Sequence, residues 1–412
     1  MQLLNVIRSV SAILLLLVVA IFLAPPSGAA SQSDDVAAQV RALTDGARVR
    51  IVWVQDAGEK SDPFAERDTL HLMGFDSLDG KGVRRILPAI GSYDKPLITD
   101  EGGRVVFGNV VDKKVYVVNW DGTGLRALVD NAALADVWTD PQTNIAWVYA
   151  HVTERRGDKD VSAIRRFDID DPAVSEMVWD KMPVSDFQVS ADGKAAAGHA
   201  GNGDGLLTLP NGTYRQFYGG CWPSMAPDDS HRVWVFRGHH KGVFVYDHDE
   251  KTNRRTEHPI EFLNAPDVPS SNELYHPRWG NHTLFFTITG SYWYKDWKWL
   301  DDIKLSNEAA AKVELYLGKF NADLDRVEEW VKITNNDRGD FFGDVWVDLN
   351  AYPEPTYTPQ AQTGQSDAIP EWPGNRTGLA FIWENKIATN EVIDADTAEI
   401  HLCPVEPRDL AL

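Results

Sequence analysis

Hydrophobic and polar residues alternate in short runs along most of this chain, and turn residues separate the runs. The clearest passage is 219–258, where the alternating run VWVFR at 233–237 follows the turn-rich sequence APDDS at 226–230. A further apolar run at 243–246 comes after the next loop. Short runs with a period of two, bounded by Gly, Asp, Asn and Pro, are typical of β-strands. The passage therefore predicts three strands of one sheet.

Helical periodicity is scarce. Only Asp34 to Leu43, near the start, and Ser306 to Val313, inside a loop, predict short helices. The 15 tryptophans lie mostly in strand-like runs, as expected for the core of a β protein.

The same order of strands and turns recurs in seven units of the sequence, most clearly at 95–129, 185–217 and 219–258. Repeated groups of about four short strands that bury both faces against their neighbours are typical of β-propeller blades, whereas a sandwich shows no such repeat. The first unit lacks an inner strand and the last lacks a clear outer strand, so ring closure is expected to pair the two ends. The sequence predicts an all-β fold with a single β-propeller at 48–412. Seven four-stranded blades are the first choice, and six or eight stay open.

Residues 1–30 have the pattern of a secretory signal peptide. Arg8 gives a basic start, an apolar run extends from Ala12 to Ala24, and small residues at 27–30 offer a cleavage site. The apolar run is short for a membrane span, and an uncleaved N-terminal anchor is the alternative. We expect an extracytoplasmic protein, periplasmic or secreted, with an N-terminal extension at 31–47 and no stable membrane insertion after cleavage.

The chain carries a net charge of −21 at pH 7. Such an acidic surface repels phosphate backbones, so the sequence argues against nucleic acid as a partner. Cys221 and Cys403 are the only cysteines. Export permits a disulfide, but the repeat places the two residues two units apart, so their pairing is left open.

Several turns and strands resemble those of TolB-type, WD40-like (PD40) β-propellers. SADG at 190–193 and APDD at 226–229 resemble the S-P-D-G turn of this superfamily, and VYVVNWDG at 115–122 resembles its IYVVDxDG strand and turn. Two units depart from the pattern, because DPQT at 140–143 and GNHT at 280–283 lack the Asp-Gly pair. The resemblance implies the fold more strongly than the function, because the superfamily includes envelope scaffolds, prolyl-oligopeptidase-type peptidases and oligogalacturonate-lyase-like polysaccharide lyases. No G-x-S-x-G elbow occurs, which excludes a serine peptidase of that type.

In a propeller of this kind, the innermost strand of each blade begins at one mouth of the central channel, and the loop between the second and third strands returns there. Asp136, Asp186 and Asp344 align at this position in three units. Carboxylates repeated by duplication favour a structural role, in which each accepts backbone N–H bonds from a neighbouring turn. A bound divalent cation is the alternative.

Histidines gather at the same mouth. Imidazole is suited to ligate a transition metal or to act as a general base near neutral pH, although ordinary solvated or capping histidines are the alternative. If a divalent metal such as Ca, Mn or Zn is bound, its expected ligands are His239, His240 and His276, although no HExxH or Cys-His zinc spacing occurs. Of the 11 histidines, the five that map to this mouth are His151, His199, His239, His240 and His276.

An aromatic loop gives the strongest binding signal. Five aromatic rings lie within eight residues of a long insertion in the sixth unit, and Trp222 is expected at the same mouth. The faces of Trp and Tyr stack on sugar rings, which favours a glycan ligand. A lid that packs its own aromatic rings onto the next blade is the alternative. The expected ligand-binding residues are Trp222, Tyr292, Trp293, Tyr294, Trp297, Trp299, His151 and His199.

These residues predict a secreted propeller that binds a polysaccharide at this mouth, with cleavage by β-elimination of a uronate-containing polymer as an open extension. That reaction needs a cation to neutralise the substrate carboxylate, a base for the proton on C5, and an acid for the leaving oxygen. The alternative is a non-catalytic, TolB-like envelope scaffold that binds a protein or peptide. The expected catalytic residues are Arg278 or Arg237 for neutralisation, His239, His240 or His276 as the base, and Tyr275 or Tyr292 as the acid.

Overall fold

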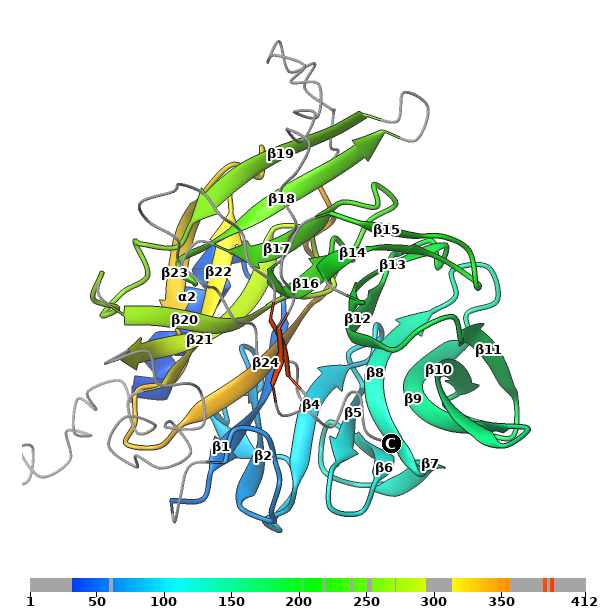
Figure 1. The fold of residues 1–412 in the computed structure, drawn as a ribbon. Helices are drawn as coiled ribbons and strands as arrows, with labels where there is room; N and C mark the ends of the chain where they lie inside the picture. Colours follow the sequence, from blue (N-terminus) through cyan, green and yellow to red (C-terminus); the bar gives the residue numbers. More distant parts are fainter. Residues whose placement is uncertain are drawn as a thin grey trace, which may run out of the picture.

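The described residues of the chain form six four-stranded antiparallel sheets that surround a common centre (Figure 1). Each sheet is one blade of a β-propeller, and the innermost strands of all six blades face one another. This structure is a computed structural model. It describes residues 32–58, 62–201, 203–217, 220–237, 240–249, 254–270, 272–293, 313–355, 381–383 and 386–388.

Five blades use four consecutive strands, because each short alternating run pairs with the run that follows it across a turn. The strands run from the innermost outward. Blade 2 contains β4 (Tyr93–Ile98), β5 (Arg104–Asn109), β6 (Lys114–Asn119) and β7 (Arg126–Asp130). Blade 3 contains β8 (Ala132–Thr139), β9 (Ala146–Arg156), β10 (Lys159–Asp168) and β11 (Ser175–Trp179). Blade 4 contains β12 (Val184–Val189), β13 (Ala195–Ala200), β14 (Gly203–Thr208) and β15 (Tyr214–Gln216).

The last two of these five blades follow the same order. Blade 5 contains β16 (Cys221–Met225), β17 (Val233–Arg237), β18 (Gly242–Asp249) and β19 (Arg254–Glu261). Blade 6 contains β20 (Asn272–Trp279), β21 (Phe285–Trp293), β22 (Glu314–Phe320) and β23 (Val327–Lys332). The passage at 219–258 is therefore the main part of blade 5.

Blade 1 closes the ring with strands from both ends of the chain. Its outer strands are β1 (Val49–Asp56), β2 (Leu70–Asp76) and β3 (Arg84–Arg85), and its innermost strand is β24 (Asp340–Val347). Strand β24 pairs antiparallel with β1, so that Val49 lies opposite Val347. Closure of this kind seals both free edges of the ring.

The first choice of seven blades is therefore wrong, and the described residues form six, one of the two counts left open. The first strand of the last predicted unit is β24, the inner strand that the first unit lacks, so the incomplete first and last units are parts of one blade. Strands β25 (Phe381–Trp383) and β26 (Lys386–Ala388) pair with each other and join no blade among the described residues. Ring closure between the two ends, expected from the incomplete first and last units, is what the structure contains.

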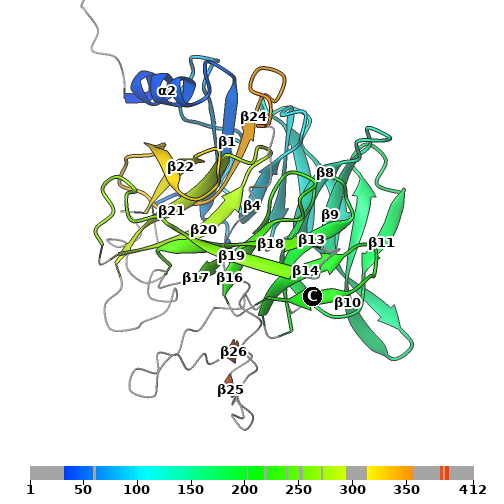
Figure 2. The ribbon, with the colours of Figure 1, turned by 90° about the horizontal axis from the view of Figure 1, so that it is seen from above.

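Helix α2 (Gln32–Leu43) lies where the amphipathic pattern predicts a helix. Figure 2 shows it outside the ring of strands, and Lys319 of β22 donates a hydrogen bond of 2.8 Å to the carbonyl oxygen of Leu43. The helix expected at 306–313 and the signal peptide expected at 1–30 lie outside the described residues. No helix in the described part of the chain is long and apolar enough to cross a membrane.

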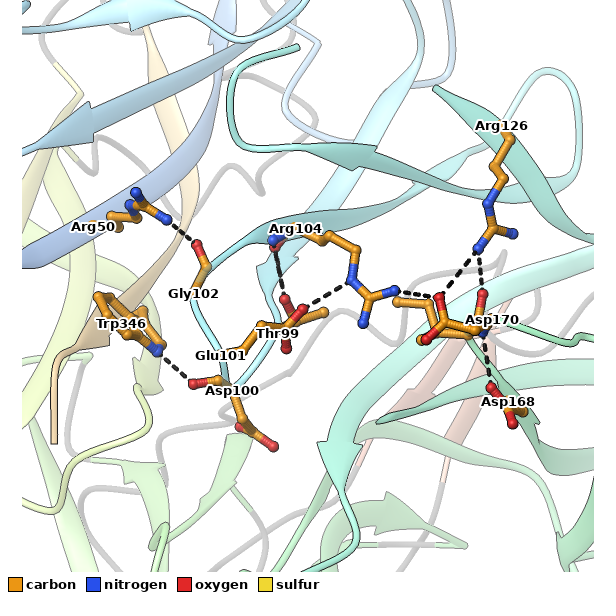
Figure 3. A network of polar contacts seen from close by, with 11 residues as sticks. Arg50, Thr99, Asp100, Glu101, Gly102, Arg104, Arg126, Asp168, Asp170 and Trp346 are labelled. Atoms are coloured by element: carbon orange, nitrogen blue, oxygen red, sulfur yellow. Dashed lines mark hydrogen bonds and ion pairs between the residues drawn. The ribbon is translucent and has the colours of Figure 1, made fainter. Parts of the chain in front are cut away.

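The blades are joined at the face opposite the mouth by tryptophan side chains. Trp346, at the end of β24 in blade 1, donates its indole N–H to the carbonyl oxygen of Asp100 in blade 2 at 2.7 Å (Figure 3). Gly102 in the same turn has a φ of +73°, and a Cβ there would lie 2.6 Å from the Trp346 ring. Arg50 of β1 adds a hydrogen bond to the carbonyl oxygen of Gly102. The Gly in this turn is therefore required by both its backbone angle and the packed indole.

The same arrangement joins blades 3 and 4 and explains the SADG turn at 190–193. Trp138, in β8, donates its indole N–H to the carbonyl oxygen of Ala191 at 2.9 Å. Gly193 has a φ of +70°, and a Cβ there would lie 2.6 Å from the Trp138 ring. The turn motif therefore forms a contact between blades, and it does not line the pocket at the mouth.

The closure strand also carries a buried carboxyl group. Asp340 of β24 is fully buried and accepts hydrogen bonds from Trp53 Nε1 at 2.6 Å and Gln55 Nε2 at 2.8 Å. Burial raises its pKa from 3.8 to about 7. Because the folded state holds this proton more tightly than the unfolded state, stability contributed by Asp340 falls as pH rises from about 4 to about 7.

We expect Asp340→Asn to flatten this part of the stability profile. The slope removed should be at most about 1.4 kcal/mol per pH unit, the limit for one proton. Urea denaturation of the variant and the wild type across this pH range measures the slope of each free energy of unfolding. The difference between the two slopes cancels the contributions of other buried carboxyl groups. The control is Asp130→Asn, at a side chain that is 67% exposed. Identical slopes in wild type and Asp340→Asn would contradict the assignment.

Candidate functional site

A pocket lies where the six innermost strands begin. It encloses about 70 Å³ and is the larger of the two best-formed pockets in the described part of the chain. Every blade contributes to its lining, so the pocket is at the centre of the ring. The contributing residues include Lys95 of β4, Ala135 of β8, Asp186 of β12, Trp222 of β16, His276 of β20 and Phe342 of β24.

A β-bulge near the start of each inner strand sets the direction of these side chains. The pairing register shifts in all six strands, for example between Cys221 and Ser224 in β16 and between Tyr275 and Arg278 in β20. Bulges bend a strand and redirect side chains, and they are common beside functional sites. In five strands the bulge contains a residue with φ between +40° and +54°, a conformation that costs non-glycine residues energy. These residues are Lys95, Asp186, Trp222, His276 and Phe342.

A second set of polar side chains follows the bulges and joins neighbouring blades. Asp344 accepts a hydrogen bond from the backbone N–H of Ile98 at 2.8 Å, and Asp136 accepts one from that of Val189 at 2.7 Å. These are the bonds expected of structural carboxylates. Both carboxylates therefore connect one inner strand to the next.

Asp186 does not belong to this set, so the predicted alignment of three aspartates is wrong. The position equivalent to Asp136 in blade 4 is Gln188, which accepts the backbone N–H of Met225 at 3.0 Å. Ser224 in blade 5 continues the pattern by accepting the backbone N–H of Trp279 at 3.0 Å. The bulges differ in length, because β8 has one residue between the paired positions Leu134 and Asp136 whereas β12 has two between Ser185 and Gln188, so Asp186 and Asp136 are not equivalent.

Arg278 crosses the centre of the ring. Its Nη2 lies 2.7 Å from Asp136 Oδ1 in blade 3, and its Nε lies 3.4 Å from Asp344 Oδ1 in blade 1. Burial raises the pKa of Asp344 to about 6 and raises that of Asp136, while the Arg278 charge opposes both shifts. Arg278 is therefore engaged by two carboxylates and is poorly suited to neutralise a substrate carboxylate.

Aromatic and imidazole rings form a cluster beside the pocket. The Trp222 ring centroid lies 4.6 Å from that of His276, 5.1 Å from that of Tyr275 and 5.8 Å from that of His240. Glu273 joins two of them, because its Oε2 accepts the Tyr275 hydroxyl at 2.6 Å and lies 3.1 Å from His240 Nδ1. Four of the residues that the sequence placed at this mouth are thus brought together.

Other expected site residues lie deeper. Tyr292 is 3% exposed, its ring packs at 4.5 Å against Tyr275, and burial raises its pKa. His151 on β9 is buried and lines the pocket. His199 on β13 lies 2.7 Å from Asp204; burial alone would lower its pKa, but the Asp204 bond and charge outweigh burial and raise it. Tyr292 and His199 therefore support the mouth and do not line the pocket.

Several expected residues are not described. His239, Tyr294, Trp297 and Trp299 lie outside the described residues, and only the backbone of Arg237 and Trp293 is described. Within the described ranges no group of three His, Cys, Asp or Glu side chains is arranged to hold a metal ion. The expected trio includes His239, so the metal site stays a prediction.

Three residues at this mouth, Lys95, Phe342 and Glu273, were not predicted from the sequence. A signal for Lys95 was present, because the bulge residue is followed by proline in three inner strands: Lys95-Pro96, Trp222-Pro223 and His276-Pro277. Phe342 and Glu273 carry no comparable signal.

Cys221 begins β16 beside this cluster, and its sulfur lies 3.7 Å from His240 Nε2. The other cysteine of the sequence, Cys403, lies outside the described residues.

The fold and the pocket define a six-bladed β-propeller with a central site. No protein-family model and no curated protein matches the chain. Among solved structures it is similar to TolB from Acinetobacter baumannii, with 12% identity, 75% of this chain and 70% of that chain covered, and a TM-score of 0.46. It is also similar to a candidate TolB from Agrobacterium tumefaciens, with 12% identity, 52% of this chain and 90% of that chain covered, and a TM-score of 0.35. A third similar structure is Kuenenia stuttgartiensis hydrazine synthase, with 11% identity, 81% of this chain and 51% of that chain covered, and a TM-score of 0.41.

Proposed function

We propose that this protein is an extracytoplasmic binding propeller that holds a glycan in the mouth of its central channel. The observation that supports the proposal is the placement of Trp222, Phe342 and His276 around one pocket built by all six inner strands. Pockets that combine aromatic walls with a few polar groups are the usual sites of small ligands.

The pocket offers both kinds of contact that a sugar ring requires. Trp222 and Phe342 supply aromatic surface, and Lys95, Asp186 and Arg278 supply hydrogen-bonding and charged groups. The strained bulges are conformations that persist where the surrounding fold enforces them, and such strain is concentrated at ligand sites.

Cleavage by β-elimination stays a prediction. Tyr275 and His240 share Glu273, an arrangement that could pass a proton, but Arg278 already serves two carboxylates. Binding therefore has more support than catalysis. The TolB-like scaffold remains the competing proposal, and the same experiment separates the two.

We expect Trp222→Ala to weaken glycan binding about 10- to 100-fold, as loss of a central aromatic contact does. Isothermal titration against glycans selected from an array measures the effect. The matched control is Trp346→Ala, because both tryptophans are 9% exposed and Trp346 lies at the opposite face. Equal losses in both variants would point to general destabilisation. If the protein binds no glycan on the array but binds a peptide at this mouth, the glycan proposal is wrong and the scaffold function is supported.

A further inference from the structure

We infer that the mouth selects a glycan carrying a protonated amine, and that the Lys95 ammonium group occupies the position that the ligand amine takes. This inference rests on the proposed function and names the ligand class for the same site. It follows from a resident ammonium group, the aromatic rings around it and the balance of charge in the pocket.

The Lys95 side chain places an ammonium group inside the pocket. Its Nζ lies 3.4 Å from Asp186 Oδ1, so a residue of blade 2 reaches a residue of blade 4. The same Nζ lies 5.8 Å from the centroid of the Phe342 ring, within the range of a cation–π contact. A carboxylate together with aromatic faces is the usual setting in which proteins recognise ammonium groups.

The charges around the pocket favour a cation. Asp186 lines the pocket, and two further carboxylates, Asp136 and Asp344, are bonded to Arg278. Among the described acidic and basic side chains that these ion pairs connect, the three carboxylates face two cations, Lys95 and Arg278. The whole chain, at −21, adds to the same field. A uronate carboxylate would be repelled here, whereas an amine would be attracted.

The pair between Lys95 and Asp186 is suited to exchange. Both side chains are 22% exposed, and partly exposed ion pairs contribute only about 0–1 kcal/mol. The lysine stem is flexible, so its ammonium can move aside without a change in the fold. Arg278 differs, because its 2.7 Å bond to a buried carboxylate fixes its position in the pocket lining.

This exchange predicts opposite effects of two substitutions. Asp186→Asn removes the carboxylate that holds the amine and should weaken binding of an amine-bearing glycan about 10-fold. Lys95→Gln removes the competing ammonium and should strengthen the same binding by a few-fold, about 3- to 10-fold. A role in folding alone would not give effects of opposite sign.

The experiment uses the full chain and three probes of equal length: a glucosamine oligomer, its N-acetylated form and an oligogalacturonate. We expect the glucosamine oligomer to bind about 10-fold or more tightly than the other two. The control variants are Asp130→Asn and Lys114→Gln, which make the same charge changes in an exposed ion pair of 2.8 Å on the outer strands of blade 2. Their affinities should stay within about twofold of wild type.

The outcomes separate the two proposals. Equal binding of the acetylated and free-amine oligomers, or a preference for the uronate, overturns the amine inference and leaves the glycan function standing. An equal loss in Asp186→Asn and Asp130→Asn also overturns it, because general attraction to an acidic chain would then explain the binding. No binding of any glycan overturns both proposals.

Discussion

Arg278→Met should destabilise the protein by about 3–5 kcal/mol, the cost of leaving buried charges without their partner. Asp136 and Asp344, which Arg278 joins across the centre of the ring, are only 3% and 7% exposed. Without the guanidinium, both carboxylates would remain at the centre with only backbone N–H donors to offset their burial. Urea denaturation of the variant and the wild type measures the difference.

The pH dependence of this loss tests its cause. Protonation removes the unpaired charges, so the loss should be smaller at about pH 5 than at about pH 8. Arg104→Met is the control, because Arg104 pairs with Glu101 and Asp170 at the surface, where the latter side chain is 72% exposed (Figure 3). That change should cost less than about 1 kcal/mol. A loss from Arg278→Met that does not vary with pH would argue against buried charge as its origin.

Trp234→Ala should cost about 3–5 kcal/mol, the range for removing a fully buried aromatic side chain. Trp234 of blade 5 stacks on Trp279 of blade 6, with ring centroids 4.1 Å apart and an interplanar angle of 22°. The edges of Phe286 and Phe320 close the remaining sides at 5.7 and 5.8 Å. The substitution would leave a cavity between two blades, and thermal and urea denaturation would report it.

A tryptophan at the outside of blade 6 provides the comparison. Trp330 on β23 is partly exposed and donates its indole N–H to Asn264 at 3.0 Å. Trp330→Ala should cost about 1 kcal/mol, because its surroundings can be refilled by water. If both substitutions cost the same, the interface between blades 5 and 6 contributes less to stability than its packing suggests.

The sequence predicted the strands well because alternation and turn residues are local signals. It did not predict the blade count, because β24 has the same local pattern whether it begins a seventh blade or completes the first. The pairing of β24 with β1, which places Val49 opposite Val347, distinguishes the two. That pairing depends on the curvature of the whole ring, which no short segment of sequence contains.

The positions of some candidate site residues were predicted for the same reason. The repeat pattern placed Trp222 and His276 at the starts of inner strands, and the structure puts their rings 4.6 Å apart. It gave no way to recognise Phe342, because a positive φ in a bulge is not visible in a hydrophobic pattern. Pairs between opposite blades, such as Arg278 with Asp136, depend on the diameter of the ring.

Closure by β24 makes the pocket a property of the complete chain. Phe342 and Gly343 of this strand form one wall of the mouth, and their partner strand β1 is near the other end of the sequence. A chain cut before residue 340 would retain five intact blades but would leave β1 as an open edge and the pocket without a side. Pairing of strands so distant in sequence is slow, because the entropy of closing the long loop must be overcome first. Ligand binding would therefore distinguish the chain that includes β24 from a product cut before residue 340, because the shorter product would lack one wall of the pocket.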